Sequence, residues 1–87
     1  MTYTVEFTSQ AEDDISRVDR VVAERIIHKI EWLSENMERV RGESLSGRFK
    51  DKFKLRVGDW RVIYSIEHSS GVITVYAVGH RREIYKA

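Results

Sequence analysis

The residues best suited to chemistry in this sequence form an alternating row, Lys52-Phe53-Lys54-Leu55-Arg56-Val57, followed by Gly58-Asp59-Trp60-Arg61. Side chains alternate between the two faces of a strand, so Lys52, Lys54 and Arg56 are expected to project from one face. The apolar residues between them would then project from the other. A row of one sign with nothing acidic interleaved favours an extended anion, and nucleic acid is the extended anion of the cell. The sequence therefore predicts a nucleic-acid-binding face.

A second group of cations lies near the end of the chain, in the run Gly79-His80-Arg81-Arg82-Glu83-Ile84-Tyr85-Lys86. Arg81 is expected to continue the odd-numbered face of the preceding strand and to share a surface with Arg61 and the first row. Five cations on one face repel one another, which is costly unless that face binds an anion. The alternative is a solvated basic surface without a function. It is the weaker interpretation because two separated segments supply the same charge to one place.

Composition limits the class of protein. The 87 residues, 41% of them apolar, are enough for a single domain over residues 1–87 with one modest core. Without cysteine, neither disulfides nor a thiolate zinc site can form, and the three histidines are too scattered to indicate a metal site. The chain begins without a signal region, and no apolar run approaches the roughly 20 residues of a membrane span. We expect a cytoplasmic protein with no cofactor, no metal and no membrane contact.

The net charge of +1 conceals an asymmetry between the two halves of the chain. Residues 1–47 contain six Lys/Arg and ten Asp/Glu, giving −4, and residues 48–87 contain nine and four, giving +5. The basic half also contains the alternating row. This distribution predicts one positively charged side of the molecule.

The first half of the chain has the pattern of one strand and two helices. Residues 2–8 alternate apolar and polar side chains, which predicts a half-buried strand. Ser9 and Glu12 form a Ser-x-x-Glu capping box, and Asp19 is a second candidate N-cap, although one bent helix is the alternative. The long helix is predicted by apolar residues at spacings of three and four: Val22, Ile26, Ile30, Leu33 and Met37. Both helices are expected on one face of a sheet.

The second half is predicted to form a loop over residues 38–48, anchored by Leu45, and then strands at about 49–57, 60–67 and 72–79. In the middle strand, one face is expected to hold Trp60, Val62, Tyr64 and Ile66. In the last strand, even-numbered and odd-numbered residues are expected on opposite faces, and both sets are largely apolar: Val72, Thr74, Tyr76 and Val78 on one face, and Ile73, Val75 and Ala77 on the other. A strand that is apolar on both faces is expected at the centre of the sheet, covered by a partner or by the residues after 80.

Three segments together resemble the RelE branch of the RelE/ParE toxin superfamily. They are Leu-x-Gly at 45–47, Phe-Lys-Leu-Arg-Val-Gly-Asp-Trp-Arg-Val-Ile-Tyr at 53–64, and Ala-Val-Gly-His-Arg-Arg-Glu-Ile-Tyr at 77–85. The resemblance covers essentially the whole chain. It implies an α+β fold of order β-α-α-β-β-β, in which an antiparallel C-terminal meander has two helices packed on one face of the sheet.

The same resemblance implies the toxin of a type II toxin–antitoxin system, with a cognate antitoxin protein, the ribosome and mRNA as partners. Toxins of the RelE type cut mRNA in the ribosomal A site by attack of a ribose 2′-hydroxyl on the neighbouring phosphate, without a metal ion. Lys52 and Lys54 match the lysine pair that holds the phosphate and helps to activate the nucleophile. Arg61 matches the arginine that stabilises transition-state charge, and Arg81 the one that assists the leaving oxygen. Tyr85 matches the C-terminal tyrosine that acts as base or orients the 2′-hydroxyl.

Three further residues, Arg56, His80 and Arg82, are expected to contact RNA. His80 has two interpretations, a catalytic acid or base and a structural histidine with satisfied hydrogen bonds. Glu83 is expected to pair with a nearby cation: Arg81, Arg82 or Lys86. Two alternatives remain for the protein as a whole, a ParE-like toxin that inhibits DNA gyrase without cutting RNA, and an inactive RNA-binding relative.

Overall fold

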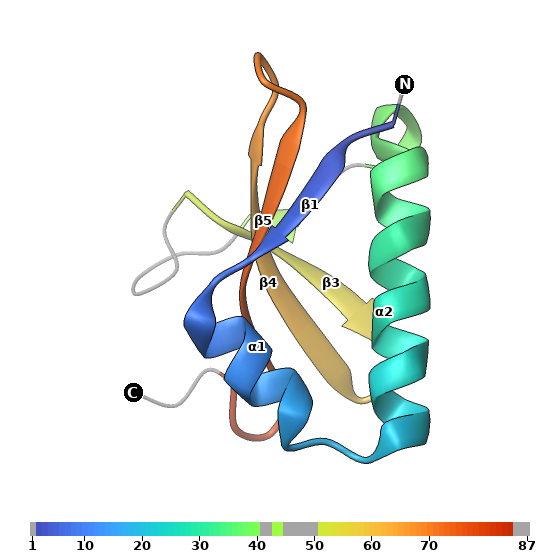
Figure 1. Ribbon diagram of the computed structural model, residues 1–87, viewed down its shortest axis with the longest axis vertical. Helices are drawn as coiled ribbons and strands as arrows, with labels where there is room; N and C mark the ends of the chain where they lie inside the picture. Colours follow the sequence, from blue (N-terminus) through green and yellow to red (C-terminus); the bar gives the residue numbers. More distant parts are fainter. Residues whose placement is uncertain (1, 41–42, 45–50, 85–87) are drawn as a thin grey trace.

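The sheet and its two helices follow the expected order, with two short elements added between the helices and the meander (Figure 1). The computed structural model describes residues 2–40, 43–44 and 51–84. Its elements are β1 (Thr4–Phe7), α1 (Ser9–Ser16), α2 (Arg20–Glu35), the 3-10 helix η1 (Met37–Arg39), β2 (Glu43–Ser44), β3 (Phe53–Val57), β4 (Trp60–Glu67) and β5 (Val72–His80). The predicted α+β class is confirmed. Within the described ranges, none of the helices combines the length and apolar character that a membrane crossing needs.

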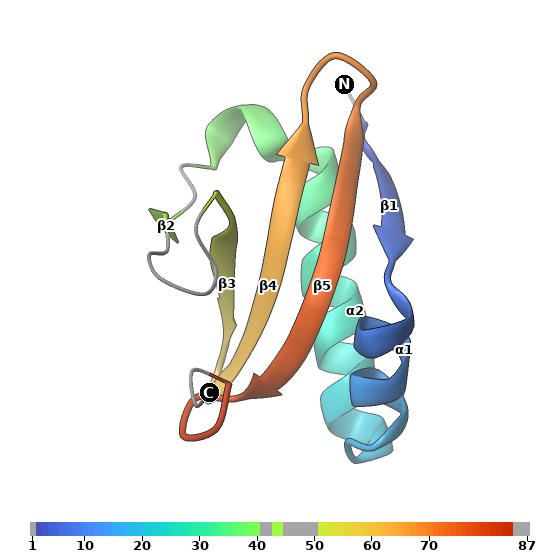
Figure 2. The same cartoon turned by 90° about the vertical axis from the view of Figure 1, so that its left-hand side faces the viewer.

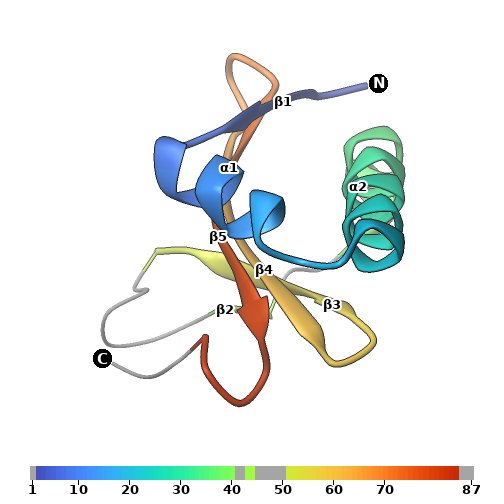
Figure 3. The same cartoon turned by 60° about the horizontal axis from the view of Figure 1, so that its bottom comes forward.

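The five strands lie in the order β1-β5-β4-β3-β2, and Figure 2 shows β5 flanked by β1 and β4. β1 pairs with β5 in parallel, and the other neighbours are antiparallel. The expectation that the last strand is central is therefore confirmed. α1 packs against β5 and β1, whereas α2 contacts β1 and β3 (Figure 3).

The two helices begin at different kinds of N-cap. Thr8, not Ser9, caps α1, because the Thr8 hydroxyl accepts a hydrogen bond from the Ala11 N–H at 3.1 Å. The Ser-x-x-Glu prediction was therefore wrong by one residue: Ser9 is already helical. At the second helix Asp19 is the N-cap, with its carboxylate accepting from the Val21 N–H at 3.1 Å. The prediction of two helices rather than one bent helix is confirmed.

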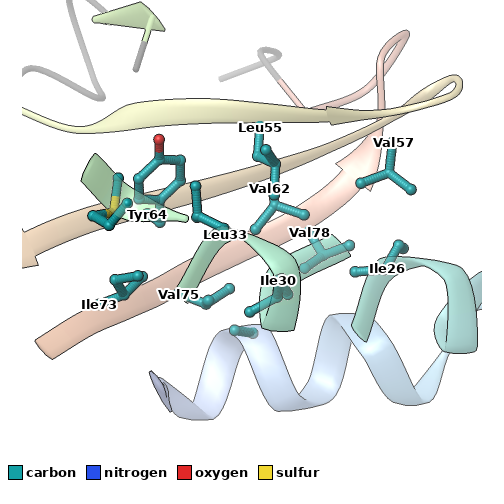
Figure 4. Packing of buried hydrophobic residues seen from close by; sticks show 12 residues of the cluster. Ile26, Ile30, Leu33, Leu55, Val57, Val62, Tyr64, Ile73, Val75 and Val78 are labelled. Atoms are coloured by element: carbon teal, nitrogen blue, oxygen red, sulfur yellow. The ribbon is translucent and has the colours of Figure 1, made fainter. Parts of the chain in front are cut away.

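The core lies between the helices and one face of the sheet (Figure 4). Its helical side follows the predicted stripe, since Ile26, Ile30, Leu33 and Met37 are buried and Val22 packs beside them. The sheet contributes its inward-facing residues: Leu55, Val57, Val62, Tyr64, Ile73, Val75 and Val78. β4 has the expected parity, because Val62 and Tyr64 point into this core and Arg61 and Ile63 point away from it.

β5 does not keep a single parity, because a bulge interrupts its pairing with β4. Ile63 pairs with Ala77 but Tyr64 pairs with Val75, so Tyr76 is the extra residue between them. Val75 and Val78 consequently both face the core, which strict alternation had placed on opposite faces. Tyr76 faces away from the core. The predicted partition of this strand was therefore wrong beyond the bulge.

The predicted loop over residues 38–48 contains part of η1 and the two-residue β2. β2 pairs with the beginning of β3, where Glu43 lies opposite Lys54. β3 begins at Phe53 rather than at about residue 49, after a turn in which Asp51 has a φ of 71°. Leu45, the expected anchor, lies outside the described residues.

Candidate active site

The alternating row forms part of the sheet face that points away from the helices, called the outer face below. Arg56 pairs directly with Arg61, and Lys54 pairs with Ile63. Side chains of directly paired residues project to the same face, so Lys54, Arg56 and Arg61 share the outer face. The intervening Leu55 and Val57 are buried on the core side. The structure therefore brings together the central members of the predicted cationic set.

Lys52 reaches the same face from the segment just before β3. Its ammonium nitrogen lies 4.5 Å from the centre of the Tyr76 ring, a cation–π contact. The Tyr76 hydroxyl is itself 3.4 Å from the Ser65 hydroxyl on β4. The bulge in β5 thus gives Lys52 an aromatic partner. Sequence alternation missed Tyr76, because a bulge leaves no composition signal here and parity assigned this residue to the face of Val78.

Arg61 is largely buried within the outer face, with 9% of the residue exposed. Its Nη1 donates to the carbonyl oxygens of Gly58 at 2.9 Å and Trp60 at 2.8 Å. Gly58 has a φ of +60°, which a glycine adopts at little cost, and this turn brings its carbonyl within reach. Arginine has five N–H donors, and within the described part of the chain no acceptor for Nε or Nη2 is found. The turn therefore fixes the direction of the guanidinium.

The turn after β5 covers the end of the outer face next to Arg61. Gly79 pairs with Arg61, and a side chain at Gly79 would meet the Cδ1 of Ile84 at 2.9 Å. Ile84 therefore lies over Gly79, and residues 81–84 fold back over this part of β5. Of the two covers expected for the central strand, a partner or the residues after 80, the structure shows the latter at this position.

Arg81 does not continue β5, because the strand ends at His80 and Arg81 opens the following turn. The Arg81 N–H donates to the Asp59 carbonyl at 2.8 Å, and Arg81 Nε lies 3.6 Å from Asp59 Oδ1. Arg81 is thus paired with Asp59 of the β3–β4 turn. With 54% of the Arg81 side chain exposed, this pair is a weak surface interaction. Of the three cations expected as partners of Glu83, Lys86 lies outside the described residues. Both Arg61 and Arg81 are anchored at the same Gly58-Asp59 turn.

His80 lies on the helix side of the sheet, on the face opposite to that of Arg61. Its ring packs edge-on against Trp60 with centroids 5.5 Å apart, and Trp60 is its direct partner in the strand pairing. Its Nδ1 accepts from the Arg82 N–H at 3.2 Å. These contacts favour the structural interpretation of His80. Arg82 is exposed on the turn, and Tyr85 lies outside the described residues.

The cations form a track along β3 rather than one cluster. Lys52 and Arg56 are four residues apart, which corresponds to about 13 Å along a strand. Lys52 and Lys54 at one end, and Arg61 and Arg81 at the other, therefore suit an anionic chain that lies along the strand.

Comparisons with known proteins agree on one family. Residues 5–85 match the family described as ParE toxin of type II toxin-antitoxin system, parDE. Toxin RelG of Mycobacterium tuberculosis is 31% identical over 87 residues, covering 99% of each chain. A chain of the toxin–antitoxin complex RelBE2 from Mycobacterium tuberculosis has a similar structure, with a TM-score of 0.83, 26% identity and 95% of each chain covered. A mutant of E. coli toxin RelE in the free state shares the fold, with a TM-score of 0.76, 24% identity, and 97% and 88% of the two chains covered.

Proposed function

Because the chain belongs to the RelE/ParE superfamily of type II toxin–antitoxin toxins, we propose that it is an endoribonuclease that cuts mRNA in the ribosomal A site. The observation that carries the proposal is the outer face, where Lys54, Arg56 and Arg61 project together and Lys52 joins them beside Tyr76. A phosphate backbone laid along this track meets cations along its length.

The reaction fits the chemistry of these side chains. The ribose 2′-oxygen attacks the adjacent phosphorus, the bond from phosphorus to the 5′-oxygen breaks, and a 2′,3′-cyclic phosphate remains. A base must take the 2′ proton, and the leaving oxygen must gain one. In this proposal Lys52 and Lys54 hold the phosphate, and Tyr85 as its phenolate, or a lysine as its free amine, takes the proton. Arg81 stabilises the leaving oxygen electrostatically, because a guanidinium is a poor proton donor, and a water molecule supplies the proton that this oxygen gains.

Arg61 is proposed to stabilise the charge that develops on the phosphoryl oxygens. Its two bonds to the turn hold the guanidinium in place before the substrate arrives. A donor that is already oriented spends no further free energy on reorganisation in the transition state. RNA-positioning roles are proposed for Arg56 and Arg82. For His80 we propose support of Trp60 and the Arg82 turn rather than acid–base chemistry.

The partners follow from the same proposal. The relative from RelBE2 was solved as a toxin–antitoxin complex, and we propose that a cognate antitoxin restrains this chain too. The antitoxin is proposed to cover the outer face or to displace the Tyr85 segment. Ribosome and mRNA would be the other partners, which places the toxin in the cytoplasm.

The test is primer extension on a translated message, with and without the toxin. Wild-type toxin should produce cuts inside codons that depend on ribosomes, and Arg61→Ala should lower the cleavage rate by about 10²–10³-fold, as loss of a preorganised donor does. Arg20→Ala is the matched control, because Arg20 is an exposed arginine on α2 paired with Glu24 at 3.1 Å, away from the outer face. Growth arrest that persists in both Arg61→Ala and Arg81→Ala would contradict the nuclease proposal.

A second candidate is inhibition of DNA gyrase, which the ParE description of the matching family favours. It predicts an intact message together with stalled supercoiling by purified gyrase. The same toxin preparation can be placed in both assays. Cleaved message with normal supercoiling selects the nuclease, and the opposite pair of results selects the gyrase inhibitor.

A further inference from the structure

A groove of about 490 Å³ lies between α2 and the β3–β4 turn, at the edge of the molecule next to the outer face. One wall is α2, which contributes Arg25, His28, Lys29 and Trp32. His28 and Lys29 follow Arg25 by three and four residues and precede Trp32 by four and three, so the four positions lie on one face of the helix. The other wall is the end of β3 and its turn, with Arg56 at the rim. Figure 1 shows the end of β3 directed at α2.

The cations of the groove are held in place by contacts with its walls. Arg25 Nη2 lies 3.3 Å from the point where a side chain at Gly58 would begin, so the missing side chain leaves room for the guanidinium. Lys29 Nζ lies 4.1 Å from the centre of the Trp32 ring, and 42% of Trp32 is exposed. Arg25 and Lys29 thus flank the groove in packed positions while their charges remain accessible.

The lining is basic, and few of its side chains are apolar. Among the described residues that line it there is no carboxylate, and Val57 and Trp32 are the apolar side chains. An amphipathic partner helix requires a row of apolar contacts, which two side chains do not provide. Arg56 also belongs to the outer face, so the positive surface continues around the edge of β3 from one face to the next. Along α2 it extends about 10 Å, from Arg25 to Trp32.

We propose that this groove binds the phosphate backbone of structured RNA and docks the toxin on the ribosome, while the outer face holds the message. The proposal rests on the proposed ribosome-dependent function. Arginine and lysine dominate contacts to RNA phosphates and position a protein without reading sequence. An exposed tryptophan beside them offers an aromatic face to an unstacked base. An acidic segment of the antitoxin is the competing class of ligand, and the test separates the two.

The experiment compares two double variants that each remove two positive charges. Arg25→Gln with Lys29→Gln alters the groove. Arg17→Gln with Arg20→Gln is the matched control, because both arginines are exposed, at the end of α1 and the start of α2, and are paired with carboxylates outside the groove. The probe is a bacterial ribosome programmed with a message that has a 2′-deoxy nucleotide at the cleavage site, so that binding is measured without cleavage. Affinity is measured from about 50 to 200 mM salt.

The groove variant should bind about tenfold more weakly than wild type at the low end of this range. Its plot of log affinity against log salt should be shallower by about 1.5, because each lost phosphate contact removes about 0.7–0.9 from the slope. The control variant should stay within about twofold of wild type. With saturating toxin and a cleavable message, the single-turnover rate should be unchanged, because neither Arg25 nor Lys29 lies on the outer face.

Three outcomes would overturn the proposal. Equal losses in the two double variants would mean that net charge alone matters. Normal ribosome affinity combined with weakened antitoxin affinity would assign the groove to the antitoxin. If the wild-type toxin binds and cuts normally and the groove variant binds ribosomes equally well, only this inference is overturned. If the wild-type toxin itself does not bind ribosomes, the proposed function is contradicted as well.

Discussion

At the scale of single residues, Tyr76 explains how a flexible lysine is held on the outer face. A lysine side chain loses up to about 2 kcal/mol of rotamer entropy when it is fixed, and a cation–π contact returns about 0.5–2 kcal/mol. The Lys52 ammonium, 4.5 Å from the Tyr76 ring centre, receives such a contact. Tyr76 is therefore a positioning residue in our proposal, because it acts through Lys52.

Tyr76→Leu should lower the single-turnover cleavage rate by up to about tenfold, and Tyr76→Phe should retain a rate within about twofold of wild type. The reason is that phenylalanine keeps the aromatic face and loses only the 3.4 Å contact with Ser65. Ribosome affinity should not change in either variant. Kinetic measurements on programmed ribosomes check both points.

A double variant provides the control for this prediction. If Tyr76 acts through Lys52, adding Tyr76→Leu to Lys52→Ala should have no further effect on the rate. Additive losses would show that the tyrosine acts independently. Equal losses in Tyr76→Leu and Tyr76→Phe would assign the effect to the hydroxyl.

Tyr64 is a residue-scale feature of the core rather than of the site. It is fully buried, and its hydroxyl has no hydrogen-bond partner among the residues that the structure describes (Figure 4). Leaving such a group unsatisfied costs about 1–3 kcal/mol, so Tyr64→Phe should leave the free energy of unfolding unchanged or raise it by about 1 kcal/mol. Urea unfolding near neutral pH measures the change. A clear loss of stability would show that the hydroxyl has a partner in solution.

The same residue gives a prediction for alkaline pH. Burial raises the pKa of Tyr64 above its usual value of 10.0, so the folded state holds the phenolic proton more tightly than the unfolded state does. Stability from this group is complete below the unfolded pKa and is lost as pH rises toward the folded pKa. Between about pH 8 and pH 11 the wild type should therefore lose more stability than Tyr64→Phe. Parallel losses in the two proteins would contradict the raised pKa.

At the scale of elements, the start of α1 tests which residue is the cap. The Thr8 hydroxyl accepts from the Ala11 N–H and donates to the Tyr76 carbonyl, each at 3.1 Å, so it joins the helix to β5. Thr8→Ala should lower the free energy of unfolding by about 1–2 kcal/mol. Ser9→Ala, at the position that sequence pattern favoured, should stay within about 0.5 kcal/mol of wild type. Thermal or urea unfolding of the two variants and of Thr8→Ser decides between the caps, and a larger loss at Ser9 would reverse the assignment.

The elements themselves were largely predictable because periodicity reports burial. The stripe through Ile26, Ile30 and Leu33 identified α2, and the two-sided apolar pattern of residues 72–79 identified the central strand. β2 was missed because two paired residues are too short to show a period. The cap was misplaced because Thr8 and Ser9 are both hydroxyl residues, and only the extended backbone of Thr8 selects between them.

The sequence predicted which residues of the site share one face of the sheet, but not how each side chain is held there. Alternation placed Lys54, Arg56 and Arg61 together, because β3 and β4 form a regular hairpin. It failed where backbone geometry departs from alternation, at the bulge that turns Tyr76 outward and at the end of β5, where Arg81 enters a turn. The attachment of Arg61 to the Gly58 carbonyl depends on a turn conformation that no spacing rule encodes.

At the scale of the whole molecule, the charge distribution sets function against stability. Residues 48–87 carry a net +5, and on the outer face Arg56 lies directly opposite Arg61. Like charges in directly opposed positions destabilise a sheet by about 0.2–1 kcal/mol. The effect should lie in the lower half of this range, because the Arg61 guanidinium is drawn toward the turn. A face that binds an anion is expected to show this cost when the anion is absent.

Arg56→Gln should therefore raise the free energy of unfolding by a few tenths of a kcal/mol at low ionic strength, while it weakens binding to programmed ribosomes. The stability gain should nearly vanish at about 1 M salt, where the screening length is about 3 Å. Arg82→Gln is the matched control, because Arg82 is an exposed cation on the turn after β5 and does not take part in the strand pairing that sets Arg56 opposite Arg61, so its removal should not change stability. Paired urea titrations at low and high salt make the comparison. If Arg56→Gln is less stable than wild type at low salt, the outer face has compensating contacts, and the charge is not held there at the expense of the fold.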